Sequence, residues 1–292
     1  MLKNLIGAGV IGLGVAISSP ALASTVNTVA NVVFIVDESG SMGGDQDFLK
    51  NSVVDKLDTD LNAAGVTTRK YGVVGFGSSS VAPRTWGTLT SNTSDTKDNL
   101  DDLTTNGGTE DGWAAINYAL SAFNYDNGAA INFILVTDED RDNWNSNSLT
   151  YSSVLQSLKA KNILLNAVVD HDFEDGSGTK AIGIDDGGSA YLAAAGGTYT
   201  TSTGGVAGAL GFGTTKGDYV DMALATGGAA WDIQLLRNST TALSFADAFI
   251  DIKVQEITTQ PPSGAIPLPA GAWLMLTGIA GLGVARRRKT KS

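Results

Sequence analysis

Residues 31–41 read NVVFIVDESGS, and the predicted class of fold follows first from them. Its first part, Asn31–Val36, is uncharged and rich in valine, which is typical of a strand buried on both faces of a sheet. Residues 131–136, INFILV, form a second run of the same kind. Strands buried on both faces belong to sheets with helices packed on either side, so these runs predict an α/β domain.

Strand and helix patterns alternate around these two runs. The expected strands are Asn31–Val36, Tyr71–Phe76, a short edge strand Thr85–Leu89, Ile131–Val136, Ile163–Val169 and Trp231–Leu236. The expected helices are Asp45–Ala64, a helix after Gly107-Gly108 with Glu110 and Asp111 in its first turn, Ser148–Lys161, Asp218–Ala225 and Ala242–Ile252. This alternation predicts a doubly wound, mostly parallel central sheet with helices on both faces, in one domain over residues 30–255.

Residues 170–217 break the alternation, because they are rich in glycine, alanine, serine and threonine. We expect an insertion without regular structure, apart from a short helix near Ala190–Ala195. Its acids at Asp170, Asp172, Glu174 and Asp175 are candidate Ca²⁺ ligands, but they lack the spacing of an EF-hand or a nonapeptide repeat. A solvated acidic loop is the simpler interpretation.

The charge is distributed unevenly along the chain. Its net value is −11, yet six of the 19 basic residues lie in terminal segments without any acid: Lys3, Arg286, Arg287, Arg288, Lys289 and Lys291. The middle of the chain therefore has 13 basic against 30 acidic residues. Such a surface repels phosphate backbones, which excludes nucleic acid as a partner and suits cations. The chain has no cysteine, so disulfides play no part, and this neither supports nor excludes export.

Residues 1–23 have the three parts of a secretory signal peptide. Lys3 supplies the positive start, Leu5–Ile17 an apolar stretch, and Ala21-Leu22-Ala23 a cleavage pattern of small residues. The apolar stretch is shorter than a membrane-spanning helix. We therefore expect export across the inner membrane, with Ser24 as the first residue after cleavage.

The C-terminal end combines a linker over residues 256–265 with a segment over 266–292. The segment begins with Ile266-Pro267-Leu268-Pro269-Ala270, stays uncharged to Ala285 and ends in the arginine cluster. Ile266–Ala285 is long enough to cross a bilayer as a helix, with the cluster on the cytoplasmic side. This order resembles the PEP-CTERM sorting signals of Gram-negative bacteria, in their VPLPA variant with isoleucine for valine. The resemblance implies processing by an exosortase-type enzyme and delivery to the cell envelope, surface or extracellular matrix. A plain membrane anchor that stays in place is the alternative.

Oxygen-bearing side chains follow three of the predicted strand ends. Asp37, Ser39 and Ser41 come directly after the first strand, Thr109 follows Gly107-Gly108, and Asp138 follows the strand 131–136. Open α/β sheets bind their ligands beyond the carboxyl ends of the strands, so we expect these groups at one edge. Carboxylate and hydroxyl oxygens are ligands of hard cations, and no cysteine competes for a softer metal.

The spacing Asp37-x-Ser39-x-Ser41 resembles the DxSxS motif of von Willebrand factor type A domains. Thr109 and Asp138 match the remaining elements of that family's metal-ion-dependent adhesion site. The resemblance implies that Ser39, Ser41 and Thr109 bind a divalent cation directly, and that Asp37 and Asp138 bind it directly or through water. Mg²⁺ is the expected ion, with Ca²⁺ or Mn²⁺ as alternatives. In this family a carboxylate from a partner often completes the coordination.

Two further acids depart from the family pattern. Many members have glycine after the aspartate of the third element, whereas Glu139 and Asp140 follow Asp138 in this chain. We treat both as possible accessory ligands, with two alternative consequences. Either they favour Ca²⁺, whose coordination shell is larger and more flexible than that of Mg²⁺, or they repel an acidic ligand.

These features favour binding over catalysis. The only histidine is His171, which we expect in a solvated loop, and no nucleophile elbow accompanies it. We expect no enzyme activity. Two functions remain open: an adhesive module that binds an extracellular protein or polysaccharide through the cation, and a structural surface or matrix protein in which the cation only stabilises the fold. Trp144 is a candidate for ligand contact near the predicted metal edge.

Overall fold

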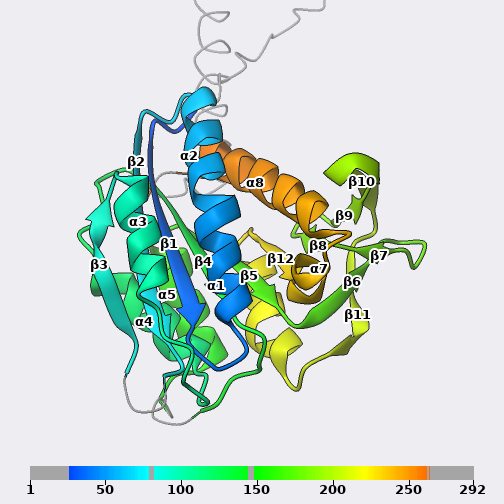
Figure 1. Ribbon diagram of the computed structural model, residues 1–292, viewed down its shortest axis with the longest axis horizontal. Helices are drawn as coiled ribbons and strands as arrows, with labels where there is room; N and C mark the ends of the chain where they lie inside the picture. The colour runs from blue at the N-terminus through cyan, green and yellow to red at the C-terminus, as the bar shows by residue number, and fades with distance from the viewer. Residues whose placement is uncertain (1–25, 79–81, 144–147, 262, 264–292) are drawn as a thin grey trace, which may run out of the picture.

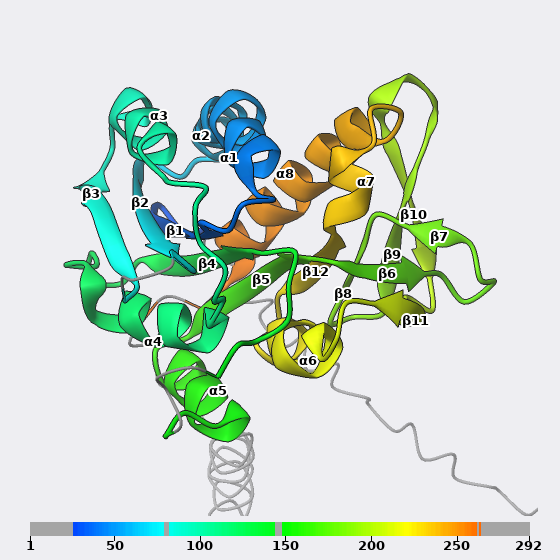
Figure 2. The same cartoon turned by 60° about the horizontal axis from the view of Figure 1, so that its bottom comes forward.

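The computed structural model describes residues 26–78, 82–143, 148–261 and 263. A large sheet with the strand order β10-β9-β8-β12-β5-β4-β1-β2-β3 lies between two layers of helices (Figures 1 and 2). Its strands are β1 (Val29–Asp37), β2 (Thr68–Phe76), β3 (Arg84–Thr90), β4 (Ala130–Val136), β5 (Ile163–Val169), β8 (Gly183–Asp185), β9 (Ser189–Ala193), β10 (Tyr199–Thr203) and β12 (Ala229–Asp232). The predicted α/β fold with a mostly parallel central sheet is confirmed.

The centre of the sheet is parallel and both of its ends are antiparallel. β12, β5, β4, β1 and β2 run side by side in one direction, while β3 pairs antiparallel with β2 and β8 antiparallel with β12. Parallel pairing brings the carboxyl ends of β1 and β4 to one edge, the lower edge in Figure 1. Residues that follow these strands are therefore neighbours in space.

Helices cover both faces of the sheet, as Figure 2 shows. One layer contains α1 (Gly43–Phe48), a π-helical turn (Leu49–Val53), α2 (Val54–Ala63), α3 (Thr93–Asp101), α7 (Ile233–Arg237) and α8 (Ala242–Thr259). The other contains α4 (Gly112–Ala122), α5 (Tyr151–Ala160), a π-helical turn (Lys216–Val220) and α6 (Asp221–Ala225). Side chains of β1 alternate between the layers, with Phe34 on the α8 side and Ile35 on the α4 side, both fully buried. Each such side chain contributes about 1.5–3 kcal/mol to stability.

Several predicted boundaries are corrected by the structure. The strand expected over 231–236 ends at Asp232, whose carboxylate accepts a hydrogen bond from the amide of Gln234 and caps α7. The last helix runs to Thr259 rather than Ile252. The helix after Gly107-Gly108 begins only at Gly112, with Asp111 as its N-cap, so Glu110 lies outside it. α3 was not predicted, because its sequence, TSDTKDNLD, is almost entirely polar.

The segment 170–217 contains six β-strands joined by short turns, so the expected absence of regular structure is wrong. β8, β9 and β10 extend the main sheet, and β6 (His171–Glu174), β7 (Lys180–Ala181) and β11 (Val206–Gly211) form a second small sheet. The short helix expected near Ala190–Ala195 is wrong, since β9 occupies most of that range. Short strands with small residues lack the long apolar runs that reveal central strands. His171 is also corrected: it lies on β6 and is only 6% exposed.

The two ends of the described domain are joined beside the amino end of β1. The side-chain amide of Asn27 donates to the backbone carbonyls of Ile257 (2.8 Å) and Gln260 (2.5 Å). The Asn27 backbone amide donates to the carbonyl of Thr258 (3.2 Å). The chain therefore enters β1 and leaves α8 at the same edge of the sheet, opposite the carboxyl ends of the parallel strands.

None of the helices within the described residues is both long and apolar enough to cross a membrane. The predicted signal peptide (1–23), the segment 266–292 and Trp144 lie outside the described residues.

Candidate metal centre

Asp37 joins the ends of two parallel strands. One carboxylate oxygen accepts a hydrogen bond from the amide of Ser39 (2.7 Å), and the other accepts one from the hydroxyl of Thr137 (2.8 Å), directly after β4. The side chain is fully buried, and this burial raises the pKa of Asp37 to about 7. The geometry of the DxSxS turn is therefore fixed from both β1 and β4.

A line of side-chain oxygens continues from Asp37 to Asp138. The hydroxyl oxygens of Ser39 and Ser41 lie 3.3 Å apart, and the Ser41 hydroxyl donates to Oδ1 of Asp138 at 2.9 Å. Ser39 is buried, whereas Ser41 is exposed to solvent. The structure thus brings together four of the five predicted ligands, taken from two strand ends.

Thr109, the fifth predicted ligand, lies on a loop that is held against the same turn. Ser39 forms a parallel bridge with Gly107, whose amide donates to the carbonyl of Glu38 at 3.0 Å. A Cβ atom on Gly107 would lie 1.8 Å from the carbonyl oxygen of Gly77, so only glycine permits this approach. The hydroxyl of Thr109 donates to the carbonyl of its own neighbour, Gly108, at 2.8 Å.

Glu110 lies buried at this edge, although the sequence predicts it in the first turn of a helix. It is 1% exposed, and neither of its carboxylate oxygens has a hydrogen-bond partner in the part of the chain that the structure describes. Burial, followed by the negative charges of Asp37, Glu139 and Asp142, raises its pKa to about 8. A buried carboxylate without a partner is costly, and a nearby cation would remove that cost.

Glu110 and Asp37 flank the same glycine. A Cβ atom built on Gly77 would lie 2.7 Å from Oδ1 of Asp37 and 3.4 Å from Cγ of Glu110. The unpartnered carboxyl group therefore belongs to the surroundings of the DxSxS turn rather than to a separate part of the core.

Arg237 is a second residue that the sequence did not reveal. Its guanidinium donates to Oδ2 of Asp138 at 2.9 Å and to the buried carboxylate of Asp45 at 2.5 Å. Arg237 lies at the end of α7, far along the chain from both partners. No local pattern could have indicated this contact.

Glu139 and Asp140 have different surroundings. Asp140 accepts hydrogen bonds from the amide (2.9 Å) and hydroxyl (3.1 Å) of Thr214, so it connects the segment after β4 to the loop before α6. Glu139 is half-buried, and burial followed by the charge of Asp138 raises its pKa. Glu139 therefore lies within the acidic surroundings of Glu110, while Asp140 is engaged elsewhere.

The donor set fits a hard divalent cation held largely by hydroxyl groups. Two oxygens bound side by side on octahedral Mg²⁺ lie about 3 Å apart, since each bond is about 2.1 Å long. The Ser39–Ser41 separation of 3.3 Å is close to this value. Within the described residues, no group of three or more histidine, aspartate or glutamate side chains is arranged to hold a metal ion by itself. A cation at this edge would therefore need the serine and threonine hydroxyls in addition to the carboxylates.

The fold and the DxSxS turn define a class of α/β domain, and comparison with known families agrees. The model of the von Willebrand factor type A domain matches residues 31–192, more than half of the chain. The chain therefore belongs to the von Willebrand factor type A domain family. The matched region ends in β9, before the last parallel strand, β12. Among curated proteins, none matches the sequence.

Solved structures to which the chain is similar include a von Willebrand factor type A protein from Catenulispora acidiphila, at 22% identity and a TM-score of 0.37. That similarity covers 49% of this chain and 33% of the other. The conserved hypothetical protein BatB from Bacteroides thetaiotaomicron has 18% identity and a TM-score of 0.42, covering 78% and 99%. Proximal thread matrix protein 1 from the mussel byssus has 15% identity and a TM-score of 0.36, covering 50% and 37%.

Proposed function

We propose that this domain binds a divalent cation, Mg²⁺ in the first place, at Asp37, Ser39, Ser41, Thr109 and Asp138. Through that cation it binds an extracellular protein or polysaccharide that supplies a carboxylate. Domains of this family commonly take part in protein–protein interaction or adhesion. The observation that carries the proposal is the line of oxygens from Ser39 through Ser41 to Asp138 at the carboxyl edge of the sheet.

Two further features support a cation at this edge. The buried carboxyl group of Glu110 lies near Asp37, and burial together with the neighbouring acids raises its pKa to about 8. A cation at this edge would favour the ionised form of Glu110 and remove the cost of burying that charge. Ser41 is exposed, which leaves the site accessible to a group from another molecule.

The proposed activity is binding rather than catalysis. His171, the only histidine of the chain, is buried on β6, and its Nδ1 lies 2.9 Å from the backbone oxygen of Asp172. That position on the small second sheet gives it no role as a general base at the DxSxS turn.

Calorimetric titration of the full-length chain with Mg²⁺, Ca²⁺ and Mn²⁺ tests the cation site. We expect one site, with affinity at least about tenfold lower in Ser41→Ala, a loss of about 1.4 kcal/mol. Asp37→Ala should lose more, although its buried hydrogen bonds also support the turn. Asp60→Ala is the matched control, because it removes an acid that pairs with Lys56 on the exposed side of α2. Unchanged affinity in Ser41→Ala would refute the site.

Capture experiments distinguish adhesion from the alternative, a structural protein in which the cation only stabilises the fold. The chain would be exposed to the envelope and extracellular polymer of its own host, with and without chelator, while circular dichroism follows the fold. Adhesion predicts that Ser41→Ala stays folded and loses the captured partner. A structural role predicts that capture follows the folded fraction alone.

We also propose that the chain is exported, processed at its C-terminal end by an exosortase-type enzyme and delivered to the envelope, surface or matrix of a Gram-negative bacterium. The support is the order of Pro267–Ala270, the uncharged stretch to Ala285 and the arginine cluster. Intact-mass measurement of the surface-exposed protein should show that residues 271–292 are missing. A mass that includes the arginine cluster would leave only a retained membrane anchor.

A further inference from the structure

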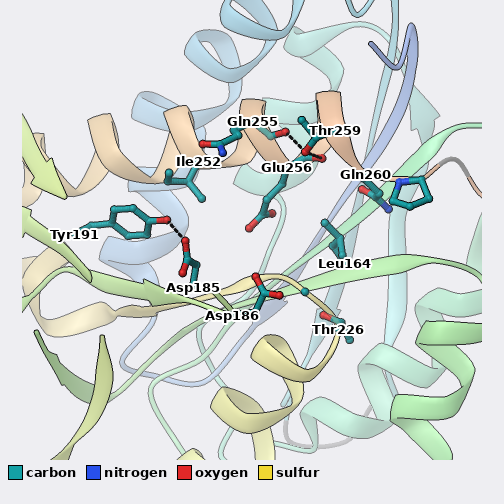
Figure 3. Close-up of a pocket in the computed structure, with 12 residues that line it drawn as sticks. Leu164, Asp185, Asp186, Tyr191, Thr226, Ile252, Gln255, Glu256, Thr259 and Gln260 are labelled. Atoms are coloured by element: carbon teal, nitrogen blue, oxygen red, sulfur yellow. Dashed lines mark hydrogen bonds between the residues drawn. The ribbon is translucent and has the colours of Figure 1, made fainter. Parts of the chain in front are cut away.

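A cavity of about 380 Å³ opens at the amino-end edge of the sheet, opposite the candidate metal centre (Figure 3). Leu164 near the start of β5 and Gly227 just before β12 line it, together with the last turns of α8. Its volume falls in the range of about 300–1,000 Å³ that small-ligand sites occupy. The cavity is therefore large enough for a small organic molecule or a long side chain.

The lining combines an apolar surface with neutral hydrogen-bonding groups. Leu164, Ile252 and the ring of Tyr191 supply the apolar part, while Gln255 contributes an amide. The hydroxyl of Thr226 also lines the cavity, but it already donates to the carbonyl of Ala223. The Tyr191 hydroxyl donates to Oδ2 of Asp185 at 2.6 Å, which fixes the ring at the wall. Sites of this kind recognise ligands that have both hydrocarbon and polar groups.

Two carboxyl groups at the cavity have oxygen atoms that accept no hydrogen bond from the described residues. Asp186 is exposed and has no hydrogen-bond or ion-pair partner within the described residues. Glu256 uses one oxygen to accept from Lys253 and from the Asn166 amide (2.9 Å), which leaves its other oxygen available. Figure 3 shows both carboxylates directed into the space between α8 and the turn after β8.

The side chains that line the cavity are acidic or neutral, which favours a positively charged ligand. Asp185, Asp186 and Glu256 all contribute to it, and none of the described lining residues is lysine, arginine or histidine. Lys253 offsets part of this charge, but it is fully buried behind Glu256 and does not line the cavity. Two carboxylates separated by a cavity suit an organic ammonium group that fits between them, whereas Ca²⁺ needs six to eight oxygens closing on one point.

We infer that this cavity is a binding site for a ligand with a primary ammonium group, held between Asp186 and Glu256 with its hydrocarbon part on Leu164, Ile252 and Tyr191. Two sources share this chemistry: a small amino sugar or amine, and the lysine side chain of another molecule. The site is independent of the cation at the opposite edge, so binding persists in chelator.

Ligand titration of the full-length chain in chelator tests this inference, with D-glucosamine and n-butylamine as probes. N-acetylglucosamine and glucose are the matched neutral probes, because they keep the sugar ring and lack the ammonium charge. We expect saturable binding of an ammonium probe with a dissociation constant of about 10 mM or lower, and no saturation with the neutral probes. Tighter binding of glucosamine indicates an amino sugar, and tighter binding of butylamine indicates a lysine side chain.

Two substitutions distinguish specific binding at the cavity from nonspecific attraction of the ammonium probe to the negatively charged protein. Asp186→Asn should weaken binding of the ammonium probe by roughly two- to fivefold, the effect of one partly solvated charge pair. Asp98→Asn removes the same charge from α3 and should change nothing. Equal effects of the two substitutions, equal binding of N-acetylglucosamine, or a requirement for Ca²⁺ would each overturn the proposal.

Discussion

Asp138 and Arg237 form an ion pair at the edge of the candidate metal centre, with 2.9 Å between Oδ2 and the guanidinium nitrogen. The other oxygen of Asp138 accepts from Ser41, so this carboxylate faces a predicted cation ligand on one side and a positive charge on the other. Arg237 also neutralises the buried Asp45. The guanidinium therefore holds Asp138 in place and, at the same time, reduces the attraction of this edge for a cation.

Removing the positive charge of Arg237 should strengthen cation binding, provided that the substitution does not leave Asp45 unpaired and destabilise the domain. Arg237→Gln alone leaves Asp45 buried and unpaired, which we expect to destabilise the domain by about 3–5 kcal/mol. Asp45→Asn/Arg237→Gln removes both charges and should regain most of that stability. The double variant should bind Mg²⁺ about three- to tenfold more tightly, measured by calorimetry at low salt. Weaker binding would show that Arg237 acts mainly by positioning Asp138.

Adjacent glycines provide a matched test of the Thr109 loop. Gly107→Ala places a Cβ atom 1.8 Å from the carbonyl oxygen of Gly77, so the loop must move and take Thr109 with it. We expect about 1–3 kcal/mol lower stability and at least about tenfold weaker cation binding. Gly108→Ala meets nothing within 4 Å and should behave like the parent chain. Denaturant unfolding and calorimetry measure both effects. Similar behaviour of the two variants would mean that the loop does not contribute a ligand.

Stability in chelator should fall as the pH rises. The pKa of Asp37 increases from 3.8 to about 7 on folding, and that of Glu110 from 4.5 to about 8. Between about pH 4 and pH 8 the folded chain therefore binds more protons than the unfolded chain, and each proton lost destabilises the fold. Mg²⁺ should raise the melting temperature more at pH 8 than at pH 5, because only the ionised groups attract it.

Glu110→Gln isolates the contribution of this carboxyl group from the other acids of the chain. In chelator we expect the variant to exceed the parent in stability by about 1–3 kcal/mol at pH 8 and to match it at pH 4. Thermal unfolding at the two pH values measures the difference. A constant difference at both would show that Glu110 does not ionise in this range.

Glu139 and Asp140 should differ in their effect on ion preference. Glu139 shares the surroundings of Glu110, so Glu139→Gln should weaken Ca²⁺ binding more than Mg²⁺ binding, by roughly two- to fivefold. Asp140 is occupied by Thr214, so Asp140→Asn should leave both affinities close to those of the parent. Calorimetry with each ion measures this, and a larger loss in Asp140→Asn would show that Asp140 exchanges Thr214 for the cation.

Local signals in the sequence account for what could be predicted. Uncharged runs with mostly apolar residues identified β1, β4 and β5, and parallel pairing then required Asp37 and Asp138 to share one edge. The contacts of Arg237 with Asp45 and Asp138 could not be predicted, because these residues are far apart in the chain. Glu110 was misplaced because an acid near a helix start is the usual pattern, whereas here Asp111 provides the cap and Glu110 turns inward. The strands between residues 170 and 217 are short and contain many glycine, alanine, serine and threonine residues, so the sequence shows no distinctive periodicity there.

The contact between Asn27 and the last turn of α8 would set the orientation of the domain if the chain is attached to a support, as proposed above. Asn27 and Gln260 lie at the same edge, so attachment through either end of the domain would place that edge nearest the support. β1 crosses the sheet from there to Asp37 with nine residues, a length of about 30 Å. The DxSxS turn then points outward, while the amino-end cavity faces the support. Tension applied through both ends would act first on the Asn27 contacts, leaving the parallel strands and the distal edge largely unloaded.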